Sequence, residues 1–210
     1  MFYEEDLDRT ELRFGDVLRG FIITYPVVDR PVMDVGLDGY EYKIDISVPA
    51  YVAVMTPCCS IGREETICLS PLTTIKDSFL NNPHFQEDMT RINRIVKRPR
   101  DRIPTRAWEA KSPEEQAAFE LTGENYTNLE YFVYDEHDSL PLYQVRDLEV
   151  RYRMVDFKRI HKVSCPNIKG SAEVLESKFL QLTDETRTEL QKKIVNYYSR
   201  PSTEELALRL

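Results

Sequence analysis

The stretch YEYKIDISVPAYVAVM, residues 40–55, carries the clearest secondary-structure signal of this chain. Within residues 40–48, apolar and polar side chains alternate without a break. Because successive side chains of a strand point to opposite faces, this alternation predicts a strand with one buried face and one wet face. Pro49 ends that strand. Residues 51–55 are apolar throughout, which is typical of a central strand buried on both faces.

Outside this stretch the sequence contains further strand and helix patterns. Strand patterns cover residues 12–24, 66–69, 129–134 and 148–154. Ser112, Pro113 and Glu115 have the spacing of a capped helix start. Residues 183–200 carry an apolar stripe at helical spacing, formed by Leu190, Ile194, Tyr197 and Tyr198. Short strands together with a packed C-terminal helix predict an α+β fold whose β part is a small curled sheet or barrel.

Composition and charge exclude several classes of protein. The chain has 210 residues, of which 41% are hydrophobic, enough for a packed core. No apolar run approaches the roughly 20 residues of a membrane-spanning helix, so no membrane partner is expected. The N-terminal residues are acidic and include no apolar signal segment, and the four cysteines do not form a disulfide framework. We therefore expect a cytoplasmic protein.

Charge is distributed unevenly along the chain. The net charge is −8, but residues 91–106 hold seven basic residues against one acidic residue, a local charge of +6 that leaves −14 for the rest. The basic residues of this basic segment are Arg91, Arg94, Lys97, Arg98, Arg100, Arg102 and Arg106. Such a segment is either a solvated surface or a binding surface for a protein or for RNA.

Three short motifs resemble those of the PemK/MazF-like toxins. They are Arg13-Phe14-Gly15-Asp16-Val17, the apolar strand 52–57, and residues 67–74, which end in Pro71-Leu72-Thr73-Thr74. The resemblance covers residues 12–76 and implies an SH3-like β-barrel that cleaves RNA with an Arg and a Thr or Ser. It implies a barrel domain over residues 12–163, interrupted by an insertion over residues 75–128. Residues 164–210 then form a C-terminal helical segment.

The catalytic pair of that family is matched only in part. The hydroxyl position falls on Thr73, whereas the arginine position falls on Ala50 or its neighbour, where no arginine stands. Cleavage of RNA requires a group that stabilises the charge of the pentacoordinate phosphorus, and alanine cannot do so. Arg63, in the turn that follows, is the candidate replacement. The resemblance therefore implies the barrel more strongly than the chemistry.

A second resemblance lies in residues 155–160 and in the tail, residues 182–201. Both look like the ends of an uncharacterised bacterial family whose members often occur among phage-defence genes. The central strand of that family ends in Thr-x-Cys, as Thr56-Pro57-Cys58 does here. This resemblance implies a role in defence and assigns no reaction.

Cysteines and histidines offer a weak candidate for a metal site. The candidate ligands of a zinc ion are Cys58, Cys68, His161 and Cys165. Strong zinc signals contain two Cys-x2-Cys pairs, and this chain has none. It also lacks a Gly-x-Gly loop that could hold a phosphate. We expect neither a metal nor a cofactor.

These observations predict a non-catalytic protein-interaction or regulatory module on a PemK/MazF-like barrel, serving in a bacterial defence system. A protein is the expected partner and RNA the second candidate; the resemblance also allows a homodimer. The alternative is a sequence-dependent endoribonuclease that uses Thr73 with Arg63.

Overall fold

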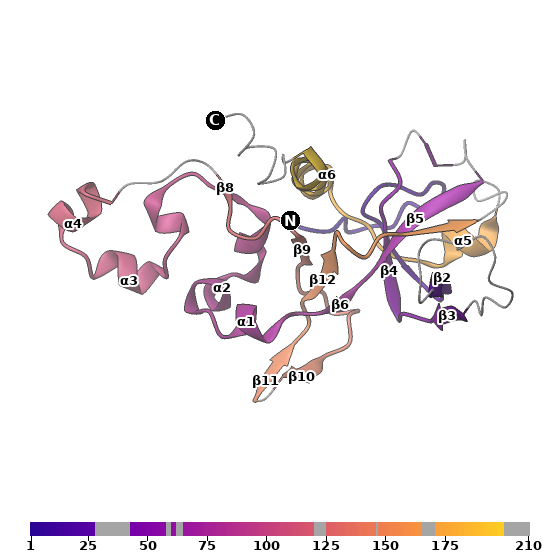
Figure 1. Cartoon of the computed structure of the whole chain (residues 1–210), viewed down its shortest axis with the longest axis horizontal. Helices are drawn as coiled ribbons and strands as arrows, with labels where there is room; N and C mark the ends of the chain where they lie inside the picture. Colours follow the sequence, from indigo (N-terminus) through magenta and orange to yellow (C-terminus); the bar gives the residue numbers. More distant parts are fainter. Residues whose placement is uncertain are drawn as a thin grey trace, which may run out of the picture. The chain divides into compact units, whose positions relative to one another are not determined.

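A computed structural model gives the structure of residues 1–27, 43–57, 60–61, 65–119, 125–145, 147–164 and 171–199 (Figure 1). It contains both helices and antiparallel sheets, which confirms the α+β prediction. The chain divides into two compact units. Unit 1 comprises residues 1–2, 73–158 and 182–210, and unit 2 comprises residues 3–72 and 159–181. Arg63, Cys58, Cys165 and the start of the 40–48 alternation lie outside the described residues.

Unit 2 is built on a five-stranded antiparallel sheet with the order β13-β5-β4-β1-β14. The strands are β1 (Val17–Arg19), β4 (Tyr51–Val54), β5 (Thr66–Pro71), β13 (His161–Ser164) and β14 (Lys178–Leu180). Helix α5 (Ala172–Glu176) precedes β14. Val52, Ala53 and Val54 have no exposed surface, so the prediction of a central strand buried on both faces is confirmed. Among the described residues the strands do not close into a hydrogen-bonded ring.

The Gly15-Asp16 turn leads into β1. Gly15 has a φ of 86°, a left-handed conformation that favours glycine. Its N–H donates to the carbonyl of Val54 at 2.7 Å, and Val54 in turn donates to the carbonyl of Asp16 at 2.9 Å. The turn therefore attaches the start of β1 to the central strand, which explains why the sequence places glycine there.

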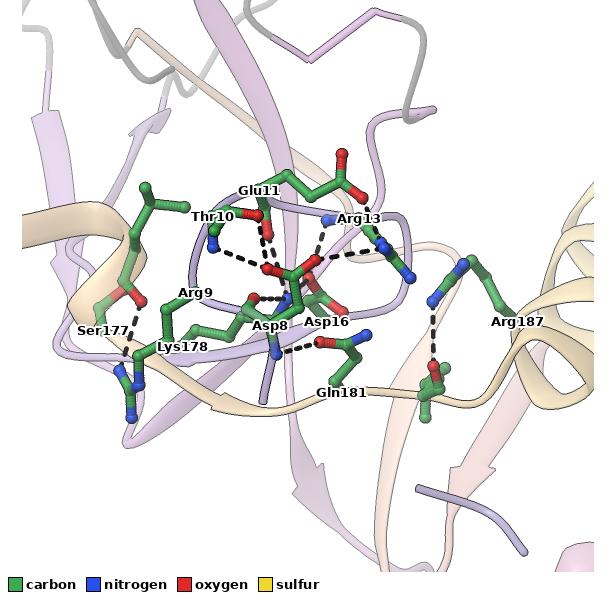
Figure 2. Close-up of polar contacts among 12 residues, drawn as sticks. Asp8, Arg9, Thr10, Glu11, Arg13, Asp16, Ser177, Lys178, Gln181 and Arg187 are labelled. Atoms are coloured by element: carbon green, nitrogen blue, oxygen red, sulfur yellow. Dashed lines mark hydrogen bonds and ion pairs between the residues drawn. The ribbon is translucent and has the colours of Figure 1, made fainter. Parts of the chain in front are cut away.

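A fully buried ion pair lies beside this turn (Figure 2). The Nζ of Lys178, on β14, is 2.8 Å from Oδ2 of Asp16, and both side chains have no exposed surface. That Nζ also donates to the carbonyls of Asp8 and Glu11, and the same carboxylate accepts a hydrogen bond from the N–H of Arg13. The N-terminal segment is thereby attached to the sheet of unit 2 by polar contacts.

The hairpin β2 (Ile23–Val27) and β3 (Lys43–Ser47) forms a separate two-stranded sheet in unit 2. The alternation correctly predicts a strand here. Its apolar face, however, is not buried: Ile44, Ile46 and Val48 are 66%, 69% and 68% exposed. The prediction of one buried face is thus wrong over the described part of the strand, because no described segment covers that face.

Unit 1 combines a three-stranded sheet with several short helices. Its sheet has the order β6-β12-β9, with β6 (Thr73–Thr74), β9 (Tyr131–Tyr134) and β12 (Arg153–Asp156). Two smaller pairs are β7 (Ile95–Val96) with β8 (Asn125–Tyr126), and β10 (Tyr143–Val145) with β11 (Leu148–Val150). The buried core joins this sheet to the helices through Phe79, Phe85, Ile92, Tyr131 and Met154.

The helices of unit 1 include those that the sequence predicts. Between β6 and β8 the chain forms α1 (Asp77–Leu80), α2 (Pro83–Glu87), the 3₁₀ helix η1 (Met89–Asn93), the 3₁₀ helix η2 (Pro99–Asp101), α3 (Thr105–Glu109) and α4 (Pro113–Ala117). Ser112 and Glu115 form the predicted capping box of α4. The long helix α6 (Asp184–Ser199) confirms the helix predicted over residues 183–200. No helix in the described ranges is long and apolar enough to span a membrane.

Candidate functional site

Unit 1 contains an open cleft with a volume of about 730 Å³. That volume lies within the range of small-molecule and peptide pockets. Its walls come from η1, β7, η2, α3, β8 and α6. The lining includes five residues of the basic segment, namely Arg91, Arg94, Lys97, Arg98 and Arg100. It also includes Trp108, which follows that segment closely, and Tyr126 and Lys192, which lie farther along the chain.

Three of these basic residues are held by carboxylates of the same unit. Arg91 lies 2.6 Å from Glu87 and also donates to the carbonyl of His84. Arg94 lies 3.3 Å from Asp88, and Arg98 lies 3.7 Å from Asp101. All three ion pairs are at least partly exposed, so each contributes little to stability. They do, however, reduce the charge that these three arginines can offer to a ligand.

Glu87 connects α2 to the start of α3. Its carboxylate accepts hydrogen bonds from the backbone N–H and the hydroxyl of Thr105, at 3.0 and 2.7 Å, in addition to the Arg91 contact. The Thr105 hydroxyl, followed by Arg91, lowers the pKa of Glu87 to about 2. The carboxylate therefore remains ionised and fixes α3, which carries Trp108 to the cleft.

The other basic residues of the lining have no carboxylate partner among the described residues. The carboxylate of Asp101 accepts from the backbone N–H groups of Lys97 and Arg98, at 3.3 and 2.9 Å, and so shapes the turn around η2. The side chains of Lys97, Arg100 and Lys192 are exposed and form no ion pair with any residue that the structure describes. We call these three residues the free cations of the cleft. They come from two separate segments, the basic segment and α6.

Aromatic and acidic residues complete the lining. The indole of Trp108 packs edge-on against Phe119 at 5.9 Å, and Tyr126 stands on β8. Burial, and then the nearby Glu189, raises the pKa of the Tyr126 hydroxyl. Glu109 and Glu189 also line the cleft, so its walls carry both signs of charge. This mixture favours a discrete acidic ligand over a long polyanion.

Two buried titratable residues support the walls. His84 is 3% exposed, and its Nδ1 lies 3.0 Å from Nη1 of Arg91. Burial, followed by Arg91, lowers the pKa of His84, which keeps the ring neutral near pH 7. Lys193 has no exposed surface; its Nζ donates to the carbonyl of Ile92 and lies 5.3 Å from the centre of the Tyr126 ring.

The helical pattern of the sequence could not identify the burial of Lys193. Leu190 and Ile194 predict the apolar stripe of α6, and the structure buries Leu190 completely. A lysine beside such a stripe is ordinarily exposed. Trp108 and Lys192 were also missed as cleft residues, because nothing in the local sequence indicates that the indole of α3 turns into the cleft or that α6 meets the basic segment.

The remaining two basic residues of the segment lie outside the cleft. Arg102 and Arg106 are exposed, and neither belongs to the lining. The segment thus divides into a part that lines the cleft and a part that faces solvent. This division provides a matched pair of surfaces for charge substitutions.

Thr73 has no catalytic environment among the described residues. Its hydroxyl donates to the backbone carbonyl of Met154 at 3.3 Å. Arg153, opposite Thr74 in the sheet, donates to the carbonyl of Pro141 at 2.8 Å, and its guanidinium stacks on Tyr143. No described arginine is hydrogen-bonded to the Thr73 hydroxyl.

Cys68 and His161 lie on adjacent strands and yet do not share a face. Cys68 is opposite Lys162, and His161 is opposite Leu69. Because directly opposed residues point to the same face and the faces alternate, the thiol and the imidazole point to opposite sides of the sheet. In the described part of the chain no three His, Cys, Asp or Glu residues are grouped so that they could hold a metal ion.

In comparisons with known proteins, no family model matches this chain, and no curated protein or solved structure is significantly similar to it.

Proposed function

We propose that this chain is a non-catalytic interaction module that binds an acidic segment of a protein partner in the cleft of unit 1. The observation that carries the proposal is the convergence of Lys97, Arg100 and Lys192 on one cleft without a described carboxylate partner. Trp108 and Tyr126 stand in the same lining. Arg, Tyr and Trp are the residue types that dominate protein interfaces, because they combine apolar area with polar contacts.

The charges favour a protein over RNA. Asp101, Glu109 and Glu189 interrupt the basic lining, whereas a phosphate backbone requires a continuous cationic track. The rest of the chain carries −14 and repels a long polyanion. A short acidic peptide can place its carboxylates on the free cations and an apolar side chain on Trp108.

We propose the PemK/MazF-like barrel for the part of its predicted range, residues 12–163, that belongs to unit 2. The antiparallel sheet and the Gly15-Asp16 turn that leads into β1 support it. Ribonuclease chemistry is the alternative, and the backbone contact of the Thr73 hydroxyl gives it no support. The place in a bacterial defence system and a homodimer follow from the resemblances alone and stay predictions.

The test compares two charge reversals within the basic segment. The full chain is titrated with a fluorescent, N-acetylated hexaglutamate peptide, and binding is followed by anisotropy. The double variant Lys97→Glu/Arg100→Glu loses at least about tenfold in affinity, because two charge-assisted contacts are replaced by repulsion. The matched control Arg102→Glu/Arg106→Glu changes the net charge equally and loses less than about threefold.

Three outcomes contradict the proposal. Equal losses in the two variants would show that only net charge matters, and absence of binding to the wild type would remove the cleft as an acidic-peptide site. Tighter binding of a single-stranded RNA 12-mer than of the peptide, in the same salt, would replace the protein partner by RNA. Cleavage of that RNA by the wild type but not by Thr73→Ala would establish the ribonuclease alternative.

A further inference from the structure

The amine of Lys193 lies behind the aromatic ring of Tyr126, which lines the cleft. Its Nζ faces the ring of Tyr126, a lining residue, and donates to the carbonyl of Ile92, next to the lining residue Asn93. On α6 its neighbours Glu189 and Lys192 both line the cleft. The side chain itself has no exposed surface.

Nothing described neutralises a charge at this position. The contacts of the Lys193 amine are one carbonyl and one aromatic face, and no described carboxylate contacts it. An ammonium removed from water without a counter-ion is strongly disfavoured. Burial accordingly lowers the pKa of Lys193 well below its usual value.

We propose that Lys193, although buried, contributes to anion binding in the cleft. Its amine takes up a proton from solvent when an acidic group of the partner occupies the cleft. This inference rests on the proposed function. An anion held in the cleft favours the ammonium, because charges interact more strongly in the protein interior than in water.

The sign of the pH dependence follows by linkage. The pKa of the amine is higher in the complex than in the free protein, so the complex binds more protons at every pH between these two values. Affinity for an anion therefore decreases as pH rises through that interval. Below that interval the amine is charged in both the free protein and the complex, and above it the amine is neutral in both. Outside the interval, Lys193 therefore no longer makes the affinity depend on pH.

Other titratable and charged groups also surround the amine of Lys193. Glu189 on α6 is the carboxylate of this set and lines the cleft. Burial raises the pKa of Tyr126 on β8, and burial with Arg91 lowers that of His84 below its ordinary 6.5. Lys192 on α6, Arg91 on η1 and Arg94, which directly follows η1, also line the cleft. At pH 8, therefore, Tyr126 and His84 are both neutral.

The experiment measures protons directly. The full chain is titrated calorimetrically with N-acetylated hexaglutamate at pH 7, 8 and 9, at each pH in two buffers of different ionisation enthalpy. The wild type takes up a measurable fraction of a proton per bound peptide. Lys193→Met still binds the peptide and loses this uptake. The matched control Lys192→Met removes an exposed lysine one position away; it binds more weakly and retains the uptake.

The outcomes separate this inference from the proposed function. Peptide binding with equal uptake in wild type and Lys193→Met, or with none in either, overturns the role of Lys193 and leaves the cleft intact. Absence of binding to the wild type overturns both proposals. If Lys193→Met does not fold, the wild type is labelled with ¹⁵N-lysine and the amine is titrated by NMR. A midpoint that the peptide does not raise overturns the inference.

Discussion

Among the described residues, two lysines are almost entirely removed from solvent, one in each unit, and the contacts of their amines differ. Lys178 in unit 2 has a carboxylate, Asp16, at 2.8 Å and two backbone carbonyls. Lys193 in unit 1 has one carbonyl and an aromatic face. The first arrangement satisfies a charge, whereas the second favours a neutral amine. The same residue type therefore serves as a structural ion in unit 2 and as a group that can gain a proton in unit 1.

The buried Asp16–Lys178 pair leads to a stability prediction. We expect Asp16→Asn or Lys178→Met alone to lower the free energy of unfolding by about 3–5 kcal/mol, because each leaves an uncompensated buried charge. The double variant Asp16→Asn/Lys178→Met loses less than the sum of the two. Urea denaturation of the four proteins measures the difference, and strictly additive losses would show that the pair is not coupled.

Lys193 leads to a prediction about pH and stability. In the unfolded chain the amine keeps its proton up to about pH 10.4, whereas in the folded chain it releases it at lower pH. Between these two values the unfolded state binds more protons, so wild-type stability rises with pH. Lys193→Met removes that dependence and is more stable than the wild type at pH 7, by at least about 1 kcal/mol.

Chemical denaturation at pH 7, 8, 9 and 10 checks this prediction. We expect the advantage of Lys193→Met to shrink steadily as pH rises towards the ordinary pKa of lysine, because protonation of the amine then stabilises the unfolded wild type less and less. An advantage that is constant with pH would mean that packing, and not the titration of the amine, distinguishes the two proteins.

At the scale of elements, the β2–β3 hairpin shows what a hydrophobic pattern does and does not specify. The alternation of residues 44–48 produces a strand in register with β2, with Ile46 opposite Thr24 and Ile44 opposite Pro26. It does not specify what covers the apolar face, and that face is exposed in the structure. By contrast, the apolar residues of β4 lie between two neighbouring strands and are completely buried.

A matched pair of substitutions tests this contrast. Ile46→Thr keeps a β-branched residue at a position that is 69% exposed, and we expect it to change the free energy of unfolding by less than about 0.5 kcal/mol. Val52→Thr places a hydroxyl at a position with no exposure and costs at least about 1 kcal/mol. Similar losses in urea denaturation would indicate that the hairpin face is covered in solution.

For the whole molecule, the long-range electrostatic field of the net negative charge opposes the local field of the free cations. The chain carries −8 overall, while the free cations act only on a ligand that is already close. Raising the salt concentration from 10 to 150 mM shortens the screening length from about 30 to about 8 Å, which removes the distant repulsion first. For hexaglutamate we therefore expect the association rate constant to stay level or rise, and the dissociation rate constant to increase.

Stopped-flow fluorescence at the two salt concentrations measures both rates. A fall of the association rate constant by more than about tenfold would show that the basic segment, and not the net charge, governs the encounter.

The amino-acid sequence by itself determined the α+β class, the buried central strand at residues 51–54, the capped helix at Ser112 and the long helix after Thr183. These features depend on alternation, capping chemistry and helical spacing, all of which act between residues close together in the chain. The sequence also located the basic segment. The resemblance to PemK/MazF-like toxins and the zinc candidates stay predictions; Arg63, Cys58 and Cys165 lie outside the described residues.

Which charges can act together depends on the three-dimensional packing of the chain. It separated Lys97 and Arg100 from Arg102 and Arg106, and brought Lys192 and Trp108 to the same cleft. It also buried Lys193, and it left the apolar face of β3 exposed. The physical reason is that burial and charge convergence depend on contacts between segments distant in sequence. A periodic pattern specifies which side of an element is apolar, and packing alone determines what that side meets.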